Sequence, residues 1–320
     1  MLYKIMIKKI FIIAFSIVLT NLTAQKNESS SLAIQHEVYY SVENGLKNPE
    51  VVKLLDLRQT NISSVNPRIR EFKNLVYLNL MKNKLNDLPT EIGQLKNLEQ
   101  LACSHNNFKE IPYSFSNLKN LKKFDAQKNK LSILSFELKK LSSVKDLNLS
   151  TNQLSLLNKN FINSKSLSFL EISQNNLTSV DASIGKLPSI KYLNVGFNKL
   201  EKFEPKFTNI KNIEYLILEH NQINKLSPKI SKLKKLKSLV INHNKIKEFP
   251  KELCNLEELE QLILGFNLIE MLPDDISKLT KLKTLILNGN PISDEAIKKI
   301  KNLLPNTTVI FNIKLSDIED

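Results

Sequence analysis

The sequence contains no tryptophan, only two cysteines and only six glycines among its 320 residues. So little glycine argues against an enzyme that closes over its substrate by flexible hinges. The sequence also lacks the motifs of common catalytic sites: G-x-S-x-G, H-E-x-x-H, G-x-x-x-x-G-K-[ST] and, after a strand, G-x-G-x-x-G. We therefore expect neither catalysis nor a cofactor.

The feature that dominates the sequence is a strict repeat of asparagine. Ten asparagines stand 23 residues apart: Asn83, Asn106, Asn129, Asn152, Asn175, Asn198, Asn221, Asn244, Asn267 and Asn290. Such a period means that one supersecondary unit is copied along an axis. Function is then expected on the surface of the array rather than in a single catalytic pocket.

Apolar residues recur at fixed positions within each unit. Eleven units follow one another without insertion or deletion, beginning at Val52, Leu75, Leu98, Leu121, Val144, Leu167, Ile190, Ile213, Leu236, Leu259 and Leu282. In each unit, positions 4 and 6 alternate with polar neighbours, which predicts a short strand with one buried face. Identical units can stack these strands only as a parallel sheet of about eleven strands, on the order of 50 Å long.

This pattern resembles the 23-residue form of the leucine-rich repeat family, LxxLxLxxNxLxxLPxxIxxLxxL, as found in exported bacterial proteins of that family. The resemblance covers nearly all of residues 52–292. It implies an α/β solenoid, a horseshoe whose parallel sheet lines the concave side. It also implies a recognition protein rather than an enzyme.

Both ends of the array are predicted to carry caps, because terminal units would otherwise expose their core to water. We assign residues 25–51 to an N-terminal cap, 52–291 to the repeats and 292–320 to a C-terminal cap and tail. Ser41 is the expected N-cap of a short helix, and Ser293 precedes a second helix. Residues 308–311 are predicted to form a last strand.

Residues 1–24 have the pattern of a secretory signal peptide. Lys8 and Lys9 precede an apolar stretch from Ile10 to Leu19, and Ala24 offers a small residue for cleavage. The stretch is short for a bilayer span, although an uncleaved signal anchor is the alternative. We expect export to a secreted, periplasmic or cell-surface location, with no transmembrane anchor in the mature chain.

Neither the cysteines nor the positive charge indicates a special partner. Cys103 and Cys254 lie six units apart, roughly 30 Å, so both should be free thiols. The full chain has a formal charge of +14, but the concave positions 2, 3, 5, 7 and 8 carry ten Lys or Arg against eight Asp or Glu. A surface that follows phosphates is therefore not indicated, and we expect no nucleic acid partner.

The concave face changes character along the array. Unit position 5 is mostly polar in the first seven units, and in the last four it is aliphatic: Ile217, Val240, Ile263 and Ile286. Aromatic side chains join this patch from positions 3 and 8: Phe169, Tyr192, Tyr215, Phe197 and Phe266. Two histidines of position 8 extend it: His220 and His243. Exposed apolar patches of this size usually have a partner, although β-branched residues also simply favour strands.

These residues predict a site for a protein or peptide ligand on the C-terminal half of the concave face. The alternative is a carbohydrate or cell-surface polymer, with tyrosines stacking on sugar rings and Asn148, Asn194 and Asn242 forming hydrogen bonds. A metal site is not expected, because only Glu219 accompanies His220 and His243.

The signal peptide gives a first testable prediction. Intact-mass measurement of native protein should show the loss of about 24 residues, with a mature chain that begins near Gln25 and lies outside the cytoplasm. A full-length chain recovered from the cytosol would contradict it.

Overall fold

The computed structural model describes residues 36–157, 164–203 and 206–311. The predicted signal peptide, residues 1–24, lies outside this part of the chain. Among the helices described, none has the length and apolar character needed to cross a bilayer.

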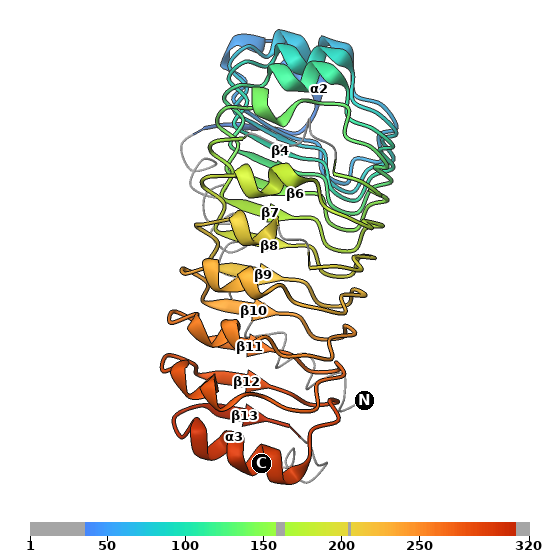
Figure 1. The fold of residues 1–320 in the computed structure, drawn as a ribbon. Helices are drawn as coiled ribbons and strands as arrows, with labels where there is room; N and C mark the ends of the chain where they lie inside the picture. Colours follow the sequence, from blue (N-terminus) through green and yellow to red (C-terminus); the bar gives the residue numbers. More distant parts are fainter. Residues whose placement is uncertain (1–35, 158–163, 204–205, 312–320) are drawn as a thin grey trace, which may run out of the picture.

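One parallel sheet runs through the described residues, with thirteen strands in chain order. Their bounds are β1 Val38–Tyr39, β2 Leu54–Asp56, β3 Tyr77–Asn79, β4 Gln100–Ala102, β5 Lys123–Asp125, β6 Asp146–Asn148, β7 Phe169–Glu171, β8 Tyr192–Asn194, β9 Tyr215–Ile217, β10 Ser238–Val240, β11 Gln261–Ile263, β12 Thr284–Ile286 and β13 Thr308–Ile310. The eleven repeat strands, β2 to β12, confirm the expected solenoid. The caps add β1 and β13, one at each edge of the sheet (Figure 1).

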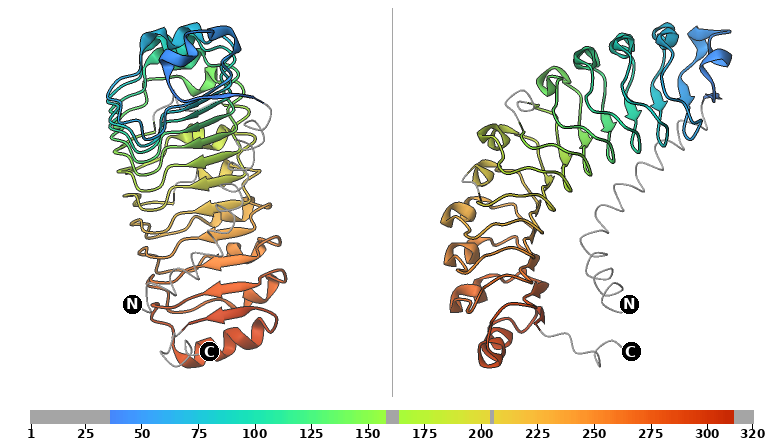
Figure 2. Two further views of the ribbon diagram at one scale, coloured as in Figure 1. Left: turned by 180° about the vertical axis from the view of Figure 1, so that it is seen from behind. Right: turned by 90° about the vertical axis from the view of Figure 1, so that its right-hand side faces the viewer.

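Short 3₁₀ helices form the outer side of the arc, and the strands line its inner side (Figure 2). Their bounds are η1 Pro49–Val51, η2 Pro67–Glu71, η3 Thr90–Gln94, η4 Tyr113–Asn117, η5 Leu138–Lys140, η7 Ala182–Lys186, η8 Phe207–Asn209, η9 Pro228–Lys232, η10 Lys251–Asn255 and η11 Asp274–Lys278. A helical turn is wider than the spacing of about 4.8 Å between neighbouring strands, so stacking such turns on the outside bends the array toward its strands. The leucines and isoleucines between the two sides form the core.

The caps use the predicted serines. Helix α2, Val42–Gly45, begins where the Ser41 hydroxyl accepts a hydrogen bond from the Asn44 N–H at 3.1 Å. Helix α3, Asp294–Leu303, begins where the Ser293 hydroxyl accepts from the Ala296 N–H at 3.2 Å. Each serine satisfies a backbone donor that has no partner inside its helix.

The repeated asparagine connects consecutive units. The Asn198 amide nitrogen lies 3.0–3.1 Å from the carbonyls of Ile172, Val195 and Gly196, and its Oδ1 accepts from the Leu177 N–H at 3.0 Å. The same pattern recurs in the neighbouring units, for example at Asn221. A single side chain thus satisfies buried backbone groups of its own unit and of the preceding one.

Removing one of these amides should be costly. Asn198→Ala leaves carbonyls and one N–H buried without a partner, so we expect the free energy of unfolding to fall by about 3 kcal/mol or more. Urea denaturation measures this loss. Lys199→Ala, at the exposed next position, is the control and should cost a few tenths of a kcal/mol. Equal midpoints and slopes for the two variants would contradict the role of the asparagine.

Candidate binding surface on the concave face

The strand register brings the predicted aliphatic residues together. Ile217, Val240, Ile263 and Ile286 are successive partners across β9, β10, β11 and β12, and we call them the apolar row. With Tyr192 they form a hydrophobic cluster separate from the main core, and Phe169, Tyr215 and Ile310 pack against it. The repeat pattern did not indicate Ile310, which lies after the last unit and which β13 places opposite Ile286. Its signal was the predicted last strand at residues 308–311.

The apolar row is less exposed than its sequence positions suggested. The side chains of its four members are only 3–7% exposed, and Tyr192 is 4% exposed. They pack against one another across strands about 4.8 Å apart, which shields each from the side. Tyr215 and Phe169 remain partly exposed at the margin. The row therefore forms the bottom of the surface rather than its projecting part.

Four rings stack in a column at the turn that follows strands β8 to β11. The centroids of Phe197 and His220 are 4.1 Å apart, those of His220 and His243 4.0 Å, and those of His243 and Phe266 4.2 Å. All four residues have the same left-handed backbone conformation, with φ between 49° and 53°. Because the unit repeats without a shift, equal backbone conformations place the rings face to face. We call this set the ring column.

Two of the aromatic residues that join the patch from unit position 3 stack on each other. Phe169 and Tyr192 are parallel, with centroids 4.3 Å apart and an interplanar angle of 8°. The ring of Tyr215 packs against the apolar cluster without a described stacking partner. These three position-3 aromatic residues therefore form one stacked pair and one separate tyrosine.

Two acidic side chains lie in the same part of the concave face. The Glu171 carboxylate accepts hydrogen bonds from the Ser173 N–H at 3.1 Å, the Asn194 amide at 3.0 Å and the Tyr192 hydroxyl at 3.2 Å. The Glu219 carboxylate accepts one from the Asn242 amide at 3.2 Å. Both glutamates are 8% exposed. From the sequence, Glu219 was notable only as a possible metal ligand beside His220 and His243.

A glycine makes room for Glu219. A Cβ atom at Gly196 would lie 3.1 Å from the Glu219 Cγ and equally close to the Asn194 Oδ1. Glu219 thus leans over the neighbouring strand, toward the side chains that hold Glu171. The two glutamates and Asn242 form a polar strip, which we call the acidic strip.

Burial determines the protonation of these groups. Burial, with a smaller contribution from repulsion by the Glu171 carboxylate, raises the pKa of Glu219 to about 7, against the opposing effect of the hydrogen bond from Asn242. Burial also raises the pKa of Glu171, against its hydrogen bonds. Within the described residues, no lysine or arginine forms an ion pair with either glutamate. Both carboxylates are therefore buried without a counter-ion.

The histidines of the ring column are neutral at physiological pH. Burial, with a smaller contribution from the neighbouring His243, lowers the pKa of His220 to about 4. Burial lowers the pKa of His243 as well. In the described part of the chain, no group of three or more His, Cys, Asp or Glu side chains is arranged to hold a metal ion.

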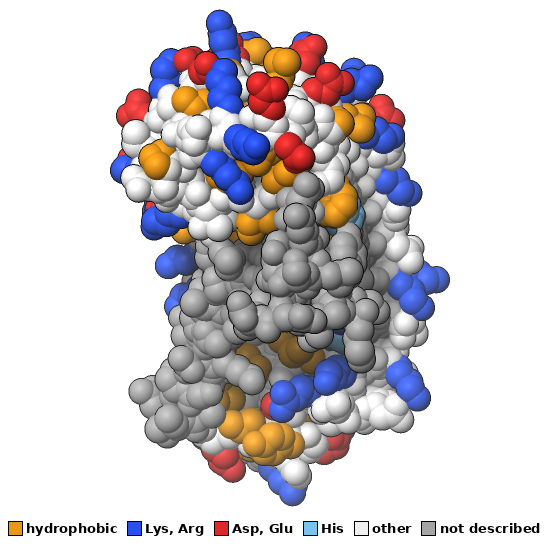
Figure 3. Space-filling view, turned by 90° about the horizontal axis from the view of Figure 1, so that it is seen from below, with side chains coloured by type: hydrophobic (Ala, Val, Ile, Leu, Met, Phe, Trp, Pro, Cys, Tyr) orange, Lys and Arg blue, Asp and Glu red, His pale blue; other side chains and the backbone are white. Residues whose placement is uncertain are grey.

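The charges at unit position 2 are paired, in contrast to the acidic strip. Glu214 contacts Lys237 at 2.7 Å and Lys191 at 3.3 Å, and Lys283 contacts Glu260 at 2.6 Å. Elsewhere on the face shown in Figure 3, Lys and Arg side chains are interspersed with Asp and Glu. Neither arrangement forms the continuous positive surface that a nucleic acid requires.

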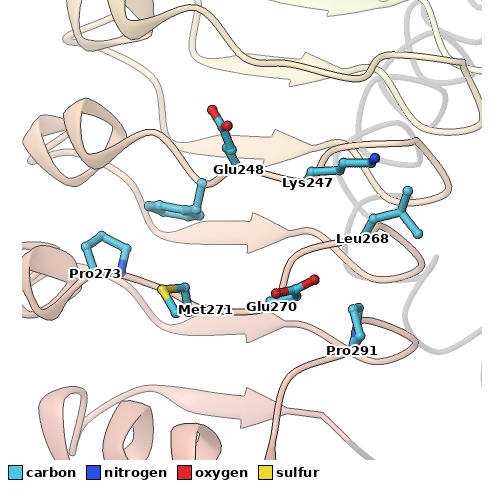
Figure 4. A pocket seen from close by; sticks show the side chains of 8 residues that line it. Lys247, Glu248, Leu268, Glu270, Met271, Pro273 and Pro291 are labelled. Carbon is cyan, nitrogen blue, oxygen red and sulfur yellow. The ribbon is translucent and has the colours of Figure 1, made fainter.

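A second surface feature was not anticipated from the sequence. An open pocket of about 760 Å³ lies on the connections that follow β10, β11 and β12. Figure 4 shows Leu268, Met271 and Pro291 at its wall, and Met271 is 72% exposed. The sequence signal for this pocket was unit position 10. This position is apolar in the last two units, at Leu268 and Pro291, and polar in the preceding units. The pocket is lined by charges of both signs, from Lys247, Glu248 and Glu270. It therefore does not indicate one class of ligand.

The raised pKa of Glu219 predicts an unusual pH dependence. Its folded value of about 7 lies above the ordinary 4.5, so the folded state holds an extra proton between these values. Relative to Glu219→Gln, the wild-type free energy of unfolding should therefore fall by about 2–3 kcal/mol as pH rises from 5 to 8. Urea denaturation of both proteins across this range measures the change.

Glu214→Gln is the matched control. The hydrogen bond from Lys237 lowers the pKa of Glu214, so the stability that this group contributes is fully present above about pH 5 and is lost only as the pH falls below that value. Its stability difference from wild type should stay nearly constant from pH 5 to 8. The same constancy for Glu219→Gln would show that Glu219 titrates normally.

Comparisons with known proteins agree with this architecture. The chain matches a family model described as "Leucine-rich repeat region" over residues 31–153. A second model, "Leucine rich repeat", matches residues 165–223, 188–246, 211–269 and 234–292. Among curated proteins, none matches the chain significantly.

Solved structures show the same fold. An internalin, InlF, from Listeria monocytogenes is 23% identical with a TM-score of 0.68, and the match covers 83% of this chain and 82% of that one. Internalin C2 of the same organism is 25% identical with a TM-score of 0.55, over 62% and 83% of the two chains. The Toll–Spätzle complex of Drosophila matches at 19% identity and a TM-score of 0.70, over 83% and 42%.

The two family models together span most of the chain, and the structure shows one parallel sheet with an asparagine at the turn of ten of the eleven units. The chain belongs to the leucine-rich repeat family.

Proposed function

We propose that this protein is an exported, non-catalytic recognition protein that binds a protein or peptide on the concave face of its C-terminal half. The observation that carries the proposal is the hydrophobic cluster on that face, which lies outside the main core. The solenoid does not need it for folding, because the polar half of the sheet uses Asp, Asn or Ala at most of the same positions. A patch that folding does not require is best explained by a ligand.

The partner class follows from the side chains present. Tyrosine and phenylalanine beside aliphatic residues are typical of the anchoring centres of protein interfaces. A related fold is also known in complex with a protein ligand, since Toll forms a complex with Spätzle. Export remains part of the proposal and depends on residues 1–24, whose basic and apolar pattern supports it.

A carbohydrate ligand fits the geometry less well. Sugar rings stack on open aromatic faces, but the faces of Tyr192, His220 and His243 are covered by neighbouring rings. Two of the asparagines offered for sugar hydroxyls are also engaged. Asn194 bonds to Glu171 and accepts from the Gly196 N–H, and Asn148 accepts from Ser150. A protein or peptide is thus the better-supported ligand.

Peptides selected by the full chain from a phage-displayed random dodecamer library test this proposal. The double variant Ile217→Asn with Ile263→Asn gives the apolar row the residue that β3, β6 and β8 carry at the same position. We expect it to weaken the selected peptides at least tenfold by titration calorimetry, because apolar contact is lost. Thermal melting verifies that each variant is folded.

Tyr215→Ser and Tyr77→Ser form a matched pair. Both tyrosines occupy unit position 3 and are partly buried, but Tyr77 lies in the polar half. Only Tyr215→Ser should weaken binding, by about fivefold or more. A loss of peptide affinity in Tyr77→Ser but not in Tyr215→Ser would place the binding site in the N-terminal half. Unchanged peptide affinity in all these variants would overturn the proposal. So would binding of the wild-type protein to a glycan array, if the same substitutions abolish that binding.

A further inference from the structure

We propose that the acidic strip binds a lysine or arginine side chain, so that the ligand is an extended peptide with a basic residue next to apolar ones. This inference rests on the proposed function and specifies the chemistry of the partner. The strip consists of Glu171, Glu219 and Asn242, as defined above. Glu219 and Asn242 lie at unit position 7, between the apolar row at position 5 and the ring column at position 8, and Glu171 lies at position 5, in line with the apolar row.

The first argument is the missing counter-ion. Glu171 and Glu219 are each 8% exposed, and in the described residues neither contacts a lysine or arginine. Burying an ionised carboxylate without a positive partner is unfavourable, and two such groups also repel each other. A cation placed between them would remove both penalties at once. The binding free energy should therefore be more favourable for a basic ligand than for a neutral one.

The second argument is an unused hydrogen-bond acceptor. The Asn242 amide nitrogen donates to Glu219, but the Asn242 Oδ1 is buried and has no partner in the described structure. Buried polar atoms are rarely left in this state, so an approaching donor would satisfy it. An ammonium or guanidinium group offers several donors and could reach a carboxylate and this amide oxygen together.

The third argument is spacing. Ile217 and Glu219 are two residues apart and on the same side of the chain, because the side chain of Leu218 between them points into the core. Such positions are about 7 Å apart, which is also the spacing of alternate side chains in an extended peptide. A peptide can therefore place a basic side chain at Glu219 and an apolar one on the row. A bare metal ion would find too few ligands in the described residues.

The neighbouring charges do not compete for this role. Glu214 and Glu260 already pair with lysines of unit position 2. The histidines next to Glu219 are neutral, since burial lowers the pKa of both. The acidic strip is thus the unpaired negative charge of the C-terminal half of the described concave face.

The test uses the phage-selected dodecapeptides and the full chain at pH 8, where Glu219 is ionised. We expect lysine or arginine to be enriched beside apolar residues. Each selected peptide is then made in a second form in which norleucine replaces its basic residue. Calorimetry should show at least a tenfold loss for the norleucine form with wild-type protein. With Glu219→Gln, the two forms should bind within about threefold of each other.

Glu214→Gln removes the same charge from a carboxylate that already has lysine partners, so it should leave the tenfold discrimination in place. If Glu219→Gln keeps the full discrimination, or if the two charge variants behave alike, the inference is overturned. Selected peptides that lack basic residues but still depend on Ile217 and Ile263 would also overturn it, while leaving the proposed function intact. Peptides insensitive to all these variants would overturn both.

Discussion

The hydrogen bonds of the repeated asparagine are the constraint on which the rest of this structure depends. Each turn after a strand leaves backbone carbonyls and an N–H group buried, and one amide side chain satisfies groups in two consecutive units. The distance between units is thereby the same throughout the array. Because the amide has a fixed reach, a residue inserted or deleted between the strand and the asparagine would break these bonds.

Constant spacing is also what assembles the concave surface. Residues at one unit position become neighbours in space, so four aliphatic residues 23 apart in sequence form the apolar row. The ring column arises in the same way, from four aromatic side chains on turns of equal φ. A repeat array can therefore build a binding surface by substitutions at exposed positions, without changing its core.

The acidic strip shows what such a surface costs the folded protein. Two carboxylates buried beside apolar residues oppose folding at neutral pH, and one of them has its pKa raised to about 7. The hydrogen bonds of the repeated asparagine and the leucine core stabilise the fold enough to tolerate these carboxylates. Unfavourable groups that persist in a rigid scaffold are commonly found where a ligand binds.

The sequence by itself determined the fold, because a 23-residue period with apolar residues at fixed positions has one way to bury them. It also placed the apolar row, since position 5 becomes aliphatic from Ile217 onward. It could not show that Glu171 and Glu219 lack counter-ions, or that the rings of His220 and His243 are covered by stacking. Those properties depend on contacts between side chains of different units and on how much water reaches them. Only the tertiary structure decides these contacts and this burial, because the residues that surround a side chain come from other units and cannot be identified from the local sequence.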